Sequence, residues 1–207
     1  MPWSKIMETT MHILESISII FASLVAIRGI SAWRHEFIGK RRIELAEKVL
    51  GAFFAVKDAI DYIRSPVLYP GEGSTRNKQE NENQKETESN NRAYIVYERY
   101  DKRRDIFNRF AVLKYRFMAS FGKDKEDIFN DITKYTGSIF NASDALRTYW
   151  QHEDDEKNRK YRDECESIIY KRSGDDPLQK NIEGVQAKLE AATSSCFKET
   201  TCWKIFL

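Results

Sequence analysis

The segment 92–122 holds the densest group of side chains able to bind a partner through charge. It contains eight basic and three acidic residues, and aromatic residues alternate with basic ones in the run RYDKRRDIFNRFAVLKYRF (99–117). Basic side chains attract the phosphate groups of nucleic acids and of lipid headgroups. This pattern defines a candidate patch for an anionic partner, which consists of Arg99, Lys102, Arg103, Arg104 and Arg109.

Three explanations of this patch are open. The aromatic residues 107, 110, 115 and 117 fall at helical spacings that a hydrophobic core needs. The segment 153–176 has nine acidic against six basic residues, so it could pair with the patch inside the same chain. We favour this intramolecular role, with contact to anionic lipid headgroups second and nucleic-acid binding last.

Metal-binding and catalytic patterns are weak. The three histidines, at positions 12, 35 and 152, are far apart in sequence. His152 and Glu156 could share one helical face in the run HEDDE (152–156), but no second histidine or cysteine is near them. The three cysteines form no C-x-x-C pair, which favours a reducing compartment. We therefore expect no cofactor, no metal and no enzyme activity, although dispersed catalytic residues leave no signature.

Helices must position all of these side chains. The 207 residues include only 4 prolines and 9 glycines, and runs of alternating β-branched residues are missing. This composition predicts an all-α fold. Charged residues make up 32% of the chain but nearly balance, with a formal net charge of +2, which argues against a general polyanion-binding protein.

The run SIIFASLVAIRGISAWRHEFIGKRR (18–42) is apolar first and basic afterwards. A helix over residues 13–32 would be about 30 Å long, close to the thickness of one hydrocarbon core. Glu15 and Arg28 lie near its ends, where their side chains can reach headgroups, although Arg28 is rather deep. We expect an N-terminal anchor at 1–33 with a transmembrane helix at about 11–33. The expected interface residues are Arg28, Trp33, Arg34, Lys40, Arg41 and Arg42.

The flanking charges predict an orientation. Basic residues follow the span, whereas Lys5 and Glu8 cancel before it, so the N-terminus is expected outside and the rest of the chain in the cytoplasm. Two alternatives are a buried core helix of a soluble protein and an amphipathic helix that lies in the membrane plane or forms oligomers. In an oligomer, Arg28 could instead face Glu15 or a water-filled interior.

The rest of the chain divides into parts by composition. Apolar residues at alternating spacings of three and four predict that the transmembrane helix continues into a juxtamembrane helix in 34–66. Its predicted buried stripe consists of Ala46, Val49, Phe53, Val56, Ile60 and Ile63. The polar segment 67–91 predicts a flexible loop. Residues 92–192 predict the remaining helices, at about 92–121, after Asp124, at about 154–171 and after the capping pair Asp176-Pro177. The segment 193–207 is a tail without clear period, and short connections predict an antiparallel bundle.

Four stretches carry a resemblance: AWRHEFIGKRRIELAEKVL (32–50), AYIVYERYDKRRDIFNRF (93–110), YRFMASFG (115–122) and GDDPL (174–178). Over roughly residues 10 to 190 the chain resembles an uncharacterised family of bacterial single-pass membrane-anchored helical proteins. The resemblance implies a bacterial source and that architecture, so the membrane is expected to be a bacterial inner membrane. It implies no activity, ligand or functional residue.

These observations lead us to expect a membrane-anchored cytosolic helical module for interaction or scaffolding. Its expected partners are a bilayer with anionic headgroups and a protein, either an unknown one or further copies of the chain. One alternative is an oligomeric membrane-acting effector of a bacterial stress or phage-defence system. A second alternative is a soluble helical protein that binds nucleic acid through the patch.

Overall fold

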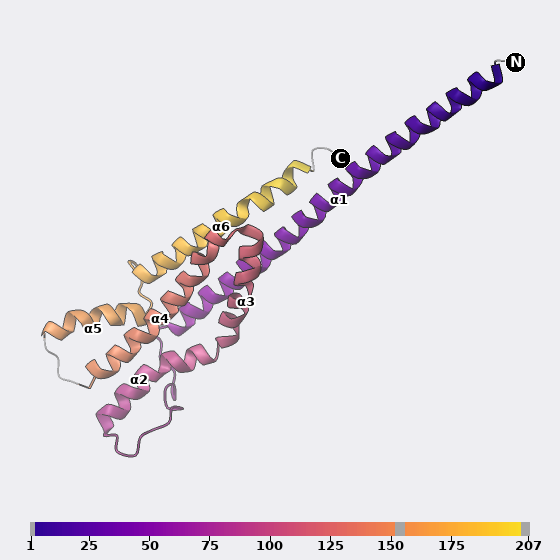
Figure 1. Cartoon of the computed structure of the whole chain (residues 1–207). Coiled ribbons are helices and arrows are strands. Elements are labelled where there is room, and N and C mark those ends of the chain that lie inside the picture. The colour runs from indigo at the N-terminus through magenta and orange to yellow at the C-terminus, as the bar shows by residue number, and fades with distance from the viewer. Residues whose placement is uncertain (1–2, 152–155, 204–207) are drawn as a thin grey trace. The chain divides into compact units, whose positions relative to one another are not determined.

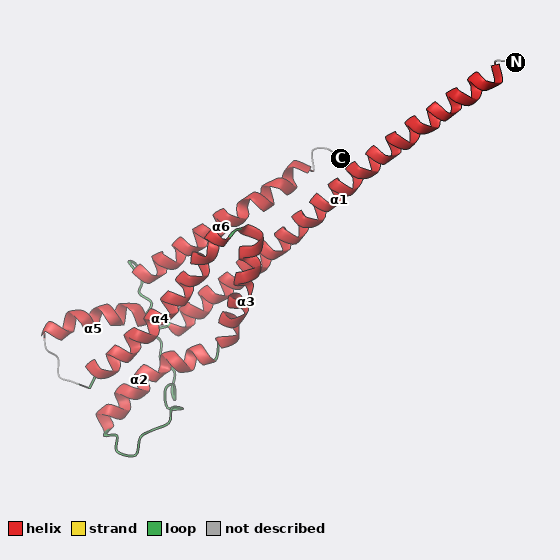
Figure 2. Cartoon of the chain, in the orientation of Figure 1, coloured by secondary structure: helices red, strands yellow, loops and turns green. Residues whose placement is uncertain are grey.

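A computed structural model describes residues 3–151 and 156–203, and over these residues the chain is helical with no strand (Figures 1 and 2). The elements are α1 (Trp3–Ile63), α2 (Gln84–Asp101), α3 (Arg104–Phe121), the short 3-10 turn η1 (Lys123–Lys125), α4 (Glu126–Tyr149), α5 (Glu156–Ile169) and α6 (Pro177–Trp203). The predicted all-α class is confirmed. The chain forms two compact units, which we call the N-terminal unit (Met1–Glu44) and the helical domain (Leu45–Leu207), and α1 contributes to both.

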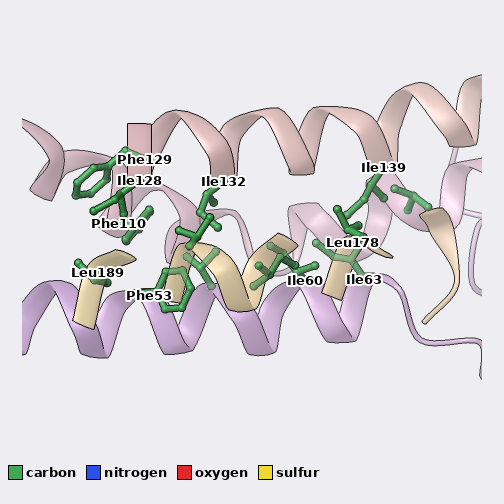
Figure 3. Packing of buried hydrophobic residues seen from close by; sticks show 14 of the residues in the cluster. Phe53, Ile60, Ile63, Phe110, Ile128, Phe129, Ile132, Ile139, Leu178 and Leu189 are labelled. Carbon is green, nitrogen blue, oxygen red and sulfur yellow. The ribbon is translucent and has the colours of Figure 1, made fainter. Parts of the chain in front are cut away.

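The helical domain is built around one hydrophobic core. Figure 3 shows side chains of α1, α3, α4 and α6 that meet in it, among them Phe53, Phe110 and Ile132. The predicted stripe of α1 is confirmed, because all six of its residues are buried. The same spacing in α4 buries Ile128, Ile132, Ile139, Ala142 and Leu146, while Tyr135 and Tyr149 are half-buried.

The predicted helix at 92–121 is interrupted at Lys102 and Arg103, between α2 and α3. In an unbroken helix, the rings of Tyr100 and Phe107 would be about 10 Å apart along the axis, because seven residues make two turns. The interruption brings their centroids to 4.9 Å, and Tyr100 also packs edge-on against Phe140 of α4. The turn therefore allows Tyr100 and Phe107 to pack together, which they could not do in one straight helix.

The polar segment 67–91 is a loop only in its first part. From Gln84 the chain is helical, because Asn83 and Glu86 form a capping box in which each side chain accepts a hydrogen bond from the other's backbone N–H at 2.9 Å. The predicted cap of the last helix is confirmed: the Gln179 N–H donates to Asp176 Oδ1 at 3.1 Å. The tail assigned to 193–207 also differs, because α6 continues to Trp203 and buries Thr193 and Cys196.

Candidate functional site

The apolar part of α1, from Thr10 to Ile38, is exposed along its whole length. Each described side chain from Thr10 to Ile38 is exposed, in contrast with the buried stripe that follows Leu45. Among the described residues, one helix is long and apolar enough to cross a membrane, and none of its apolar 18-residue stretch is buried. A continuous exposed apolar surface of this length is unusual in water-soluble proteins. We therefore expect an apolar partner or environment to shield these side chains from water.

Aromatic and basic side chains of the N-terminal unit form a ladder on one helical face. The Trp33 and Phe37 rings stack at 5.7 Å, and the Arg41 guanidinium lies 4.5 Å from the Phe37 ring centroid. These residues are four positions apart, so they fall above one another on the helix. Of the other expected interface residues, Arg28, Arg34 and Lys40 are exposed and Arg42 is half-buried. Phe37 was not among the interface residues predicted from the sequence, although its spacing of four residues from Trp33 indicates it.

The candidate patch on α2 and α3 is mostly paired inside the helical domain. Lys102 binds Glu98 at 2.7 Å, and Arg104 pairs with Asp101. Arg103 lies over the Tyr62 ring at 5.0 Å, and exposed Arg109 donates to the Asp105 backbone carbonyl at 3.3 Å. The acidic partners of Lys102 and Arg104 therefore come from α2 itself, whereas the segment 153–176 was predicted to supply them.

Arg99 belongs to the interior of the helical domain, and its place in an exposed patch needs correction. The guanidinium binds both carboxylate oxygens of Glu72, at 2.6 and 3.0 Å. It also donates to the backbone carbonyls of Ser65 at 2.7 Å and Val67 at 2.6 Å. The hydrogen bond from Arg99 lowers the pKa of Glu72, although burial opposes this effect. Arg99 thus fixes the loop that follows α1.

A second buried arginine, Arg64, closes the end of α1. It binds both oxygens of Asp176 at 2.8 and 3.0 Å. It also donates to the carbonyls of Ser167, Ile168 and Tyr170 at 3.0, 2.7 and 3.3 Å. These carbonyls belong to the C-terminal end of α5, where helical carbonyls lack partners within the helix. Asp176 is the cap of α6, so Arg64 joins the ends of three helices.

The environment of Asp176 favours its ionised form. Burial opposes ionisation, but hydrogen bonds from the Gln179 backbone, from Arg64 and from the Arg172 backbone outweigh it and lower the pKa of Asp176. From the sequence, Asp176 was predicted only as a cap, and its ion pair with Arg64 was not predicted. The available signal was an arginine directly after a buried stripe that ends at Ile63.

The described residues carry little that resembles catalytic chemistry. They contain no group of three or more histidine, cysteine, aspartate or glutamate side chains arranged to hold a metal ion. Cys165 and Cys196 are buried, and burial raises the pKa of the Cys165 thiol. His12 lies against Glu15 at 3.4 Å, and the HEDDE run (152–156) falls outside the described side chains.

Comparison of the chain with protein-family models, curated proteins and solved structures finds no match. The function is therefore argued from the arrangement of the residues.

Proposed function

We propose that the chain is a single-pass membrane protein in which the first half of α1 anchors the helical domain at the cytoplasmic face of a bacterial inner membrane. There the domain acts as an interaction or scaffolding module. The observation that carries this proposal is that every apolar side chain between Thr10 and Ile38 is exposed. A core helix of a soluble protein would bury them within its own chain.

The energies favour insertion. Eleven large apolar residues between Met11 and Ile30 are exposed. Burying each in hydrocarbon stabilises by about 1.5–3 kcal/mol, so the total is roughly 15–30 kcal/mol. Glu15 and Arg28 would each cost about 3 kcal/mol at the bilayer centre, and less near its edges. The apolar gain exceeds this cost several-fold.

The ladder of Trp33, Phe37 and Arg41 suits one edge of the bilayer. Aromatic rings concentrate at membrane interfaces, and basic side chains beside them reach the phosphates. Arg34, Lys40 and Arg42 add charge on the same side of the span. This excess of positive charge supports the inside orientation for everything after Trp33.

Contacts within the helical domain support an antiparallel arrangement of α1 and α3. Arg103, just before α3, lies against Tyr62, whereas Phe110, further along, packs against Phe53 at 6.1 Å. Later α3 residues thus approach earlier α1 residues. We infer the up-and-down bundle on this basis.

Carbonate extraction of membranes tests the anchor. The wild-type chain is expected to stay in the pellet. Leu24→Arg places a charge in the middle of the span and costs about 3 kcal/mol, so it should shift the protein markedly toward the soluble fraction. Ala187→Arg adds the same charge at an exposed position of α6 and should behave as wild type. A wild-type chain that washes off completely would refute the proposal.

Orientation needs an engineered cysteine, because Cys165 and Cys196 are buried. Lys85 is exposed on α2, so a Lys85→Cys chain in a Cys202→Ser background provides a reactive thiol in the domain. A membrane-impermeant maleimide should label it only after the inner membrane is opened. A Ser4→Cys chain in the same background should be labelled in intact spheroplasts, and the reverse pattern would contradict the orientation.

One observation favours a second candidate, the membrane-active oligomeric effector. Glu15 falls on the same helical face as Ser18, Ala22 and Ala26. Small residues allow close approach of helices in a bilayer, and a carboxylate among them could line a water-filled path. Dye leakage from expressing cells that Glu15→Gln abolishes would support the effector, and a wild-type chain that causes no leakage would support the simple anchor.

A further inference from the structure

The outer face of α3 exposes two apolar residues next to two arginines. Val112 and Tyr115 are 71% and 74% exposed, more than any other large apolar residue of the described helical domain. Arg109 and Arg116 are exposed on the same face, three residues before Val112 and four residues after it. We call Arg109, Val112, Tyr115 and Arg116 the α3 surface.

The α3 surface itself carries only positive charge, and one acidic residue, Asp105, lies one turn before Arg109 on the same helix. From Ile106 to Lys123 the chain contains four basic residues and no acidic one. Lys114 binds Glu126 at 2.8 Å, so that cation is neutralised. Within the described part of the chain, by contrast, neither Arg109 nor Arg116 forms an ion pair with a carboxylate. Two cations thus remain open to an anionic partner.

The direction of α3 brings this surface toward one end of the domain. Arg103 meets Tyr62 and Phe110 meets Phe53, so residues after Phe110 lie toward Leu45. Leu45 is where the chain enters the domain from the proposed anchor. Eleven residues (34–44) connect Trp33 to Leu45, and as a helix they span about 16 Å.

We propose that the α3 surface binds the anionic headgroup layer of the same bilayer that holds the anchor. This inference rests on the proposed function. Arginines pair with lipid phosphates and carboxylates, while a valine and a tyrosine insert at the boundary between headgroups and acyl chains. Each basic residue raises the bound population roughly fivefold. The tether adds a high local concentration of lipid, so weak contacts suffice.

The size of the surface distinguishes a bilayer from other anionic partners. A stable protein interface buries about 800 Å² on each side and uses 20–30 residues. Four residues of one helix fall far below this size. Nucleic acid would use a longer row of cations, and most cations of the neighbouring patch on α2 are already paired with Glu98, Asp101 or Glu72.

Photocrosslinking in nanodiscs tests this proposal with the full chain. Tyr115 is replaced by p-benzoylphenylalanine, and the chain is reconstituted either in phosphatidylcholine alone or in an equal mixture with phosphatidylserine. Tyr69, an exposed tyrosine in the loop fixed by Arg99, provides the matched control site toward the other end of α1. Lipid adducts, measured by mass spectrometry, are expected at position 115 and to rise roughly fivefold or more with phosphatidylserine. Position 69 should give few adducts in either lipid.

Charge variants complete the test. Arg109→Gln with Arg116→Gln should remove most of the phosphatidylserine dependence, whereas Lys85→Gln with Lys134→Gln removes the same charge from exposed positions on α2 and α4 and should change little. Equal adduct yields at positions 115 and 69, or adducts insensitive to the arginine pair, would overturn the α3 proposal alone. Adducts only to other proteins in native membranes would assign the surface to a protein partner. A chain that does not co-purify with nanodiscs would overturn the anchor and the α3 proposal together.

Discussion

The buried pair of Arg64 and Asp176 makes a quantitative prediction about stability. Asp176→Asn is the sharpest perturbation, because asparagine keeps the shape of the side chain and caps a helix as well as aspartate does. The substitution therefore removes the negative charge and leaves the cap of α6 in place. The Arg64 guanidinium would remain buried with its charge uncompensated.

The magnitude follows from the burial of the pair. Arg64 is 0% exposed and Asp176 is 3% exposed. Removing one partner of such a buried pair costs about 3–5 kcal/mol. For a domain of this size, a loss of about 3 kcal/mol lowers the melting temperature by roughly 10 °C. Asp175→Asn is the matched control: its carboxylate is 80% exposed and pairs with exposed Lys180, so that variant should melt with the wild type.

Thermal unfolding of the full chain in detergent micelles, followed by far-ultraviolet circular dichroism, measures the effect. A second variant, Arg64→Met with Asp176→Asn, removes both charges and keeps the cap of α6, so it separates charge from hydrogen bonding. Methionine fills the space of the arginine stem but leaves the three carbonyls at the end of α5 without donors, so the variant should not recover wild-type stability. An Asp176→Asn chain that melts together with Asp175→Asn would refute the reasoning.

Three further predictions follow from the same structure. Because the pKa values of Asp176 and Glu72 are lowered in the fold, their contribution to stability is present above about pH 5 and is lost at lower pH. The melting temperature should therefore fall below about pH 4, and less steeply in Asp176→Asn. Gly73→Ala should destabilise more than Gly71→Ala in the same melts: both glycines have positive φ, but only at Gly73 would a methyl group overlap a backbone carbonyl of α2. Arg28→Leu should keep the chain in the carbonate pellet, and its release would show that Arg28 does more than reach headgroups.

The periodic parts of the fold could be predicted from the sequence. Spacings of three and four residues identified the buried face of α1, the same spacing recurs on the buried face of α4, and Asp176-Pro177 identified the start of α6. These signals are local, because side chains at such spacings fall on one helical face wherever the helix lies. The capping box of Asn83 and Glu86 is an equally local signal, but the segment around it is so polar that a loop was predicted there.

The role of the arginines could not be predicted in the same way. Arg99 and Arg104 lie in one basic run, but Arg99 is buried on Glu72, whereas the side chain of Arg104 is exposed and pairs with Asp101. Glu72 is 27 residues from Arg99, and Asp176 is 112 residues from Arg64. The composition of a run gives the number of its charges but not their distances from possible partners in the fold. Arg99 was therefore predicted to lie on the surface. The packing of segments that are distant in sequence decides which basic side chains stay exposed. The α3 surface could be recognised only once the ion pairs of the neighbouring basic residues were known.

Both buried arginines make hydrogen bonds at the end of α1 that apolar residues could not make. In many proteins a buried ion pair can be replaced by hydrophobic residues of similar volume without loss. Here the guanidiniums also donate to backbone carbonyls, Arg64 to three at the end of α5 and Arg99 to three around the loop after α1. A buried carbonyl without a donor is costly, so the fold needs planar side chains with several donors at these two points. Arginine meets this need where lysine would not, because three donors on one flexible nitrogen cannot span the same set of acceptors.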